Sequence, residues 1–103
     1  MNAIFINANE KKVEAIEIEN DIHAFYNKIG CEVIEVINLR NNFLLIVDEE
    51  ARLRNVQTGF NLQGFPVTIL GNGILVREDK FSNFIGCNLP PEVEVNFASF
   101  AKK

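Results

Sequence analysis

The sequence predicts an α+β fold, in which an N-terminal β-hairpin and one amphipathic helix are followed by a mostly antiparallel sheet. Three observations lead to this prediction. Short apolar segments with the pattern of strands recur along the chain, one segment has helical periodicity, and Asn and Gly residues mark tight turns. Of the 103 residues, 48% are hydrophobic, which suffices for a core. A chain of this length buries about two thirds of its surface and has no room for a second domain. We therefore expect a single domain over residues 1–103.

The N-terminal hairpin is predicted from two neighbouring segments. Ala3–Asn7 is a short apolar run, and Asn7–Lys11 is polar and turn-like. In Lys12–Glu19, the apolar residues Ile16 and Ile18 alternate with glutamates, as in a half-buried strand. The Glu and Ala content of this second segment also permits a helix, but we prefer the hairpin.

One amphipathic helix is predicted over about residues 20–30. Asn20-Asp21 offers an N-cap, and Gly30 supplies the residue that a left-handed C-terminal cap requires. The spacing i, i+3, i+4 and i+7 predicts a single apolar face, formed by Ile22, Phe25, Tyr26 and Ile29.

Two further hairpins are predicted downstream. Cys31–Leu39 and Phe43–Val47 have the composition of strands, and Asn41-Asn42 forms the turn between them. The second of these strands is apolar at every position, which is typical of a fully buried strand. Val67–Leu70 and Ile74–Arg77 flank Gly71-Asn72-Gly73, and this sequence predicts a tight hairpin because Asn and Gly tolerate a positive φ.

Other segments are less regular. Asn55–Pro66 has no clean period, and Phe81–Cys87 fits either a short strand or a loop. For residues 91–101, prolines at the start favour a final helix, whereas the alternation of Val93, Val95 and Phe97 favours a strand. Both alternatives stay open.

Several of these segments resemble the domain-of-unknown-function family 3846. The resemblance covers the opening Met1–Ile18, the hairpin Glu32–Asp48 with its Asn-Asn turn, the short connection Glu49–Asn55, and the segment Val67–Val76. Members of this family are small proteins of phages, plasmids and their bacterial hosts, and the family has no established catalytic motif. The resemblance therefore implies an accessory protein of a mobile genetic element.

Charge and cysteine content restrict the partners and the location. The net charge of −4 argues against a nucleic-acid partner, which calls for a basic surface. The sequence shows no secretory leader and no apolar run near the roughly 20 residues that span a bilayer. Two cysteines are too few for a secreted disulfide framework, although one bridge between Cys31 and Cys87 stays open. We expect a cytoplasmic protein, in the host cytoplasm if it is phage-encoded, that does not bind membranes.

Few residues have the chemistry of a catalytic centre. His23 is the lone imidazole and lies off the apolar face of the predicted helix. Both cysteines have the apolar or glycine neighbours of small buried residues. The acidic runs Asp48–Glu50 and Glu78-Asp79 follow strands and lack the spacing of known metal sites. We therefore expect no enzyme activity, no cofactor and no metal.

An anion site is one hypothesis for ligand binding. The arginines fall near strand ends or in connections, where their guanidinium groups could converge on a phosphate; these are Arg40, Arg52, Arg54 and Arg77. Scattered surface charge is the alternative.

The segment Gln57–Phe65 is the preferred location for a ligand. Phe60 and Phe65 could stack on a flat group, while the amides of Gln57, Asn61 and Gln63 could read the donors and acceptors of a nucleobase. The alternative is a loop whose aromatic side chains pack inward.

The function expected from these residues is non-catalytic binding by stoichiometric occupancy, for example sequestration of a small nucleotide-like ligand as an anti-defence protein. A module that masks a host protein and a small nucleotide hydrolase are the alternatives. A homo-oligomer is also expected if exposed strand edges combine with an apolar patch formed by some of the C-terminal aromatic residues, Phe81, Phe84, Phe97 and Phe100. The alternative, which stays open, is that these residues belong to a C-terminal element that closes the core.

Overall fold

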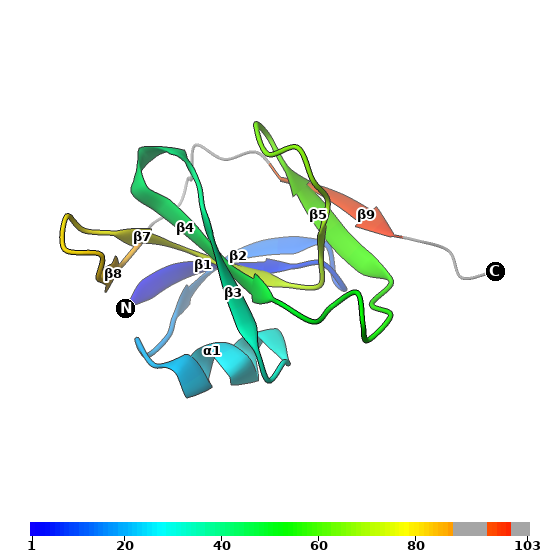
Figure 1. The fold of residues 1–103 in the computed structure, drawn as a ribbon, viewed down its shortest axis with the longest axis horizontal. Coiled ribbons are helices and arrows are strands. Elements are labelled where there is room, and N and C mark those ends of the chain that lie inside the picture. The colour runs from blue at the N-terminus through cyan, green and yellow to red at the C-terminus, as the bar shows by residue number, and fades with distance from the viewer. Residues whose placement is uncertain (88–94, 100–103) are drawn as a thin grey trace.

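The computed structural model describes residues 1–87 and 95–99, which form two antiparallel sheets and one α-helix (Figure 1). The larger, six-stranded sheet has the order β2-β1-β7-β4-β3, with β8 paired to β7. Its strands are β1 (Asn2–Asn7), β2 (Lys12–Glu17), β3 (Ile34–Asn38), β4 (Phe43–Asp48), β7 (Gly73–Glu78) and β8 (Phe84–Ile85). The smaller sheet has the order β6-β5-β9, formed by β5 (Thr58–Leu62), β6 (Ile69–Leu70) and β9 (Val95–Ser99). The predicted α+β class is confirmed.

The central strands of the larger sheet, β1, β4 and β7, are buried on both faces. One face packs against helix α1 (Ile22–Ile29), and the other face packs against the smaller sheet. The central strands therefore alternate between two cores. In β4, Leu45 and Val47 face the smaller sheet, whereas Leu44 and Ile46 face the helix. This explains why the sequence of β4 is apolar at almost every position, since neither side of the strand faces water.

The N-terminal hairpin and the helix are confirmed. β1 and β2 pair antiparallel, with Asn2 opposite Glu17 and Asn7 opposite Lys12. Helix α1 ends at Ile29, and Gly30 adopts the left-handed conformation with φ of 84° while its N–H donates to Tyr26 O. The apolar face is narrower than predicted, because Ile22 is 46% exposed. Neither α1, with its eight residues, nor any other helix in the described ranges is long enough to cross a membrane.

The hairpin of β3 and β4 is also confirmed. The register runs from Ile34 opposite Asp48 to Asn38 opposite Leu44. At the tip, Asn41 and Asn42 both have a positive φ, 60° and 64°, as the central residues of a type I′ turn do. Asparagine tolerates this conformation better than most residues, which is why the turn forms at this pair.

The predicted hairpin around Gly71-Asn72-Gly73 is wrong. β6 pairs with β5 in the smaller sheet, whereas β7 pairs with β1 and β4 in the larger one. The turn therefore carries the chain from one sheet to the other. Two hydrogen bonds hold it, from Gly71 N–H to Thr58 O at 2.8 Å and from Ala8 N–H to Asn72 Oδ1 at 2.8 Å. The same residue types can start a hairpin or a crossover, and the long-range pairing decides between them.

The irregular segments fold as short strands in the described ranges. Residues 58–62, for which no strand was predicted, form β5, and β8 lies in the segment left open between strand and loop. Of the C-terminal alternatives, the strand is found for Val95–Ser99, and the rest of residues 91–101 lies outside the described ranges. Phe84 packs in the core between the larger sheet and α1, called here the helix-side core. Phe97 packs in the core between the two sheets, called here the inter-sheet core, so these two rings do not share a patch. Phe100 lies outside the described residues.

Gly73 and Phe60 join the two sheets. The Phe60 side chain is fully buried and lies directly over Gly73, where a Cβ atom would be 2.8 Å from Phe60 Cζ. The absence of a side chain on Gly73 therefore makes the space for the ring. Its strand neighbours Ile6 and Val47 complete the same part of the inter-sheet core.

Replacing Gly73 by alanine tests this contact. We expect Gly73→Ala to lower the free energy of unfolding by about 1–3 kcal/mol, because the new methyl group overpacks the core. Phe60→Leu makes room for that methyl group, so the double variant should lose less than the sum of the two single variants. Chemical denaturation of all four proteins measures the coupling. Strictly additive losses would contradict the contact.

The two cysteines lie on opposite sides of the larger sheet. Cys31 belongs to the helix-side core and Cys87 to the inter-sheet core, and both are free thiols. Burial raises the pKa of each thiol above its ordinary value, which lowers the fraction of reactive thiolate.

We expect both thiols to react with a disulfide reagent at pH 8 at least about 100-fold more slowly in the folded protein than in denaturant, because reaction requires local opening. Stopped-flow absorbance with Cys31→Ala and Cys87→Ala variants assigns each rate. Rapid labelling of the folded protein at either position would show that the corresponding core is open.

Candidate functional site

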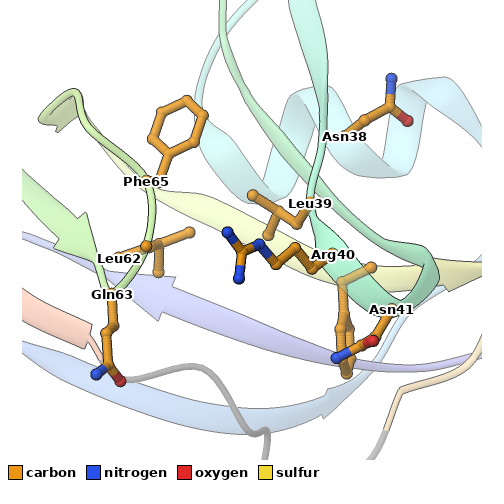
Figure 2. A pocket seen from close by; sticks show the side chains of 9 residues that line it. Asn38, Leu39, Arg40, Asn41, Leu62, Gln63 and Phe65 are labelled. Carbon is orange, nitrogen blue, oxygen red and sulfur yellow. The ribbon is translucent and has the colours of Figure 1, made fainter.

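A cavity of about 640 Å³ opens between the β3–β4 turn and the loop that follows β5 (Figure 2). One wall comes from the larger sheet and the other from the smaller sheet. The lining residues are Asn38, Leu39, Arg40, Asn41, Phe43, Leu62, Gln63, Gly64 and Phe65.

The cavity lies at one end of the inter-sheet core. Leu39, Phe43 and Phe65 are partly buried against that core, and Leu62 belongs to it. The opposite wall turns back on itself because Phe65 N–H donates to Leu62 O at 3.1 Å. The apolar side chains at the end of the core therefore become the floor of the cavity, and the two turns form its rim.

Arg40 is the cation of this cavity. Figure 2 shows its side chain extending from the β3–β4 turn toward Leu62 and Phe65 on the other wall. Across residues 1–87 and 95–99, the ion pair found is Arg54 with Asp48, so Arg40 has no carboxylate partner there. The lining residues also include no Asp or Glu. Among the described lining residues, the charged group is therefore a cation, in a protein whose net charge is −4.

Amides and aromatic rings complete the lining. Gln63 and Asn41 lie on opposite walls in Figure 2, and each amide can both donate and accept hydrogen bonds. Phe65 and Phe43 supply rings that are partly exposed. A guanidinium, several amides and two rings together suit a ligand with an anionic group and a flat polar group.

The predicted arginines do not converge. Arg54 pairs with the buried Asp48 and donates to Gly30 O at 3.3 Å. Arg52 lines another cavity, and the Arg77 guanidinium lies 5.6 Å from the centre of the Phe43 ring. Of the four arginines, Arg40 lines the cavity of Figure 2, and Arg77 contacts one of the other lining residues, Phe43.

The predicted residues of the Gln57–Phe65 segment also do not share one site. Phe65 lines the cavity, whereas Phe60 is fully buried and cannot stack on a ligand. The Gln57 amide donates to Asn55 O at 2.9 Å, and Asn61 Oδ1 accepts a hydrogen bond from Thr68 Oγ1 at 2.6 Å. The reason is that Thr58–Leu62 is a strand, which turns Phe60 inward and leaves the residues after it at the cavity.

Sequence reasoning did not connect this segment with the β3–β4 turn. Asn38, Leu39, Asn41 and Phe43 line the cavity, and none of them was predicted as a site residue. The available signal was the position of Arg40 next to a turn of two asparagines, which places a cation at the end of a hairpin.

The lone histidine lies elsewhere. His23 is exposed on α1, where its ring meets the Tyr26 ring edge-on at 5.8 Å between centroids. It does not line the cavity of Figure 2. Among the residues that the structure describes, no three His, Cys, Asp or Glu side chains gather as a metal-binding group.

Comparison with known proteins places the chain in a family. Neither the curated proteins nor the solved structures gave a significant match. A family model described as a domain of unknown function, DUF3846, matches residues 1–97. Because this match spans nearly the whole chain, the protein belongs to the DUF3846 family.

Proposed function

We propose that this protein is a non-catalytic binding protein of a phage or another mobile element, acting in the host cytoplasm by stoichiometric occupancy. Its ligand is a small nucleotide-like molecule, held in the cavity between the β3–β4 turn and the loop after β5. Binding would withdraw such a molecule from a host defence response without changing it chemically. The mobile-element origin rests on the family resemblance.

The observation that carries this proposal is the lining of the cavity. Arg40 extends into the cavity, the described lining residues include no Asp or Glu, and Phe43 and Phe65 belong to the same lining. A guanidinium binds phosphate through paired hydrogen bonds, and aromatic faces stack on bases of any sequence. The amides of Asn41 and Gln63 supply donors and acceptors for a base edge or a ribose.

The size of the cavity agrees with this ligand class. Its volume of about 640 Å³ lies within the range of about 300–1,000 Å³ that is typical of small-molecule sites. In the proposed arrangement, a phosphate meets Arg40 and the base lies against Phe65. The apolar floor formed by Leu39 and Leu62 excludes water beneath the ligand.

An interaction module that masks a host protein is the second candidate, and the Phe81 side chain favours it. Phe81 is 73% exposed at the turn between β7 and β8. The Asp79 carboxylate holds this turn by accepting hydrogen bonds from Phe81 N–H at 2.8 Å and Asn83 N–H at 3.0 Å. An exposed aromatic ring on an ordered turn is typical of a protein contact.

Arg40→Gln tests the ligand site, with Arg52→Gln as the matched control on another cavity. Cyclic and linear mono- and dinucleotides are screened by thermal shift, where a ligand at 100 times its dissociation constant adds about 2.7 kcal/mol of stability. We expect Arg40→Gln to weaken binding about 10–100-fold, since a charged hydrogen bond is lost, and Arg52→Gln to leave it unchanged. Phe65→Leu should weaken binding through lost stacking.

The fate of the bound nucleotide separates capture from catalysis. The complex is heated and the released molecule is analysed by mass spectrometry. Release of the intact nucleotide agrees with capture, whereas a hydrolysed product would favour the nucleotide hydrolase. No thermal shift with any nucleotide would contradict the ligand proposal and favour the masking of a host protein.

The stability of the turn that contains Phe81 should decrease at acid pH. The hydrogen bond from the Asn83 backbone, together with that from Phe81, lowers the pKa of Asp79 below its ordinary value of 3.8. The charged carboxylate therefore stabilises the turn fully above that ordinary value, and the stabilisation is lost as the pH falls through the lower folded pKa. NMR titration of the Phe81 and Asn83 amides measures the midpoint. Asp79→Asn should abolish this titration, and a midpoint above 3.8 would contradict the assignment.

A further inference from the structure

The strand β3 forms an exposed edge of the larger sheet. It lies at the end of the order β2-β1-β7-β4-β3, and it crosses the front of the molecule in Figure 1. The opposite edge strand, β2, carries charges that discourage pairing, namely Lys12, Glu14 and Glu17. Within its own bounds, β3 carries a single charged residue, Glu35, and the side chain of Val36 is 39% exposed.

Two hydrogen bonds establish which backbone groups of β3 face outward. Glu49 N–H donates to Val33 O at 3.1 Å, and Leu39 N–H donates to Phe43 O at 2.9 Å. In an antiparallel pair, the residues whose backbone points to the partner strand alternate. Residues 33, 35, 37 and 39 therefore bond toward β4, and the N–H and C=O groups of Ile34, Val36 and Asn38 point away from it.

We propose that β3 pairs with β3 of a second copy of this chain, antiparallel, with the two Val36 residues opposite each other on a two-fold axis. Ile34 of each copy then lies opposite Asn38 of the other, and all three residues with outward backbone groups exchange hydrogen bonds. The two larger sheets become continuous, which removes the exposed edge from both copies. This inference does not depend on whether the cavity of Figure 2 binds a nucleotide.

The side chains favour a second copy in this register. Glu35 is placed opposite Ile37 of the second copy, whereas a two-fold axis at Glu35 would set two carboxylates directly against each other. An axis at Ile37 would place Ile34 opposite Arg40, beyond the end of β3 at Asn38. A two-fold axis at Val36 thus gives the register in which all outward backbone groups of β3 form hydrogen bonds and no like charges lie opposite each other.

The surface beside β3 is suited to the same contact. A cavity of about 220 Å³ lies between β3 and β6, with Ile37, Val67 and Leu70 in its lining. Val67 is 49% exposed. Arg52 lines the same cavity with Glu35, Asp48 and Glu49, and Asp48 is already paired with Arg54. Each copy therefore presents both an arginine and further carboxylates beside this edge, which permits ion pairs across the contact.

Val36→Pro tests the proposal. The N–H of Val36 faces outward and takes no part in the pairing with β4, so proline at this position removes a dimer hydrogen bond and spares the monomer. Ala15→Pro is the matched control. Met1 and Ile18 exchange hydrogen bonds at 2.9 Å, which by the same alternation turns the N–H of Ala15 outward on the opposite edge strand.

Sedimentation equilibrium gives the dissociation constant of each protein, and circular dichroism reports whether it is folded. We expect a wild-type dimer, a folded Val36→Pro variant with a dissociation constant raised at least about tenfold, and an unchanged Ala15→Pro dimer. A wild-type protein that stays monomeric at about 100 μM overturns the proposal, and so does a folded Val36→Pro variant that dimerises like the wild type.

If Val36→Pro fails to fold, Val36→Glu decides the question, because it sets two carboxylates against each other on the two-fold axis while changing an exposed side chain. A folded monomer then supports the β3 interface, and a folded dimer overturns it.

Discussion

The burial of the central strands of the larger sheet on both faces is the constraint on which the rest of the structure depends. Helix α1 covers one face and the smaller sheet covers the other, so β1, β4 and β7 must carry apolar side chains on both sides. These central strands have no water-facing side on which polar residues could be placed. Charged residues are therefore found on the edge strands β2 and β3, at strand ends and in turns, and the cavities open at these strand ends and turns.

The cavity of Figure 2 follows from this arrangement. Between the sheets, Phe60 fills the space over Gly73, and the core is closed. Toward the β3–β4 turn, the Phe43 and Phe65 rings are only partly buried, and they line a cavity together with amides and one guanidinium. The cavity thus combines apolar and polar groups because it lies where the packing between the two sheets ends and the turns begin.

Local patterns predicted the local structure. The helix with its Gly30 cap, the N-terminal hairpin and the Asn41-Asn42 turn were all confirmed, because each depends on residues close in sequence. The hairpin around Gly71-Asn72-Gly73 was wrong because two different sheets compete for its flanking strands, and only the tertiary packing selects the partner. The site was partly predicted for the same reason. Arg40 and Phe65 were both candidates from the sequence, and they line the same cavity. No sequence pattern indicated that residues of two different sheets would meet there.

The contacts of Arg54 tie together three parts of the chain. Its guanidinium pairs with Asp48 at the end of β4 and binds the carbonyl of Gly30 at the end of α1, and Asp48 also accepts a hydrogen bond from Glu50 N–H at 2.9 Å. Helix α1 and β4 are therefore joined by polar contacts as well as by the apolar packing of the helix-side core. The Arg54 guanidinium thus compensates a carboxylate that is buried at the end of β4, and the same side chain closes the C-terminal end of the helix.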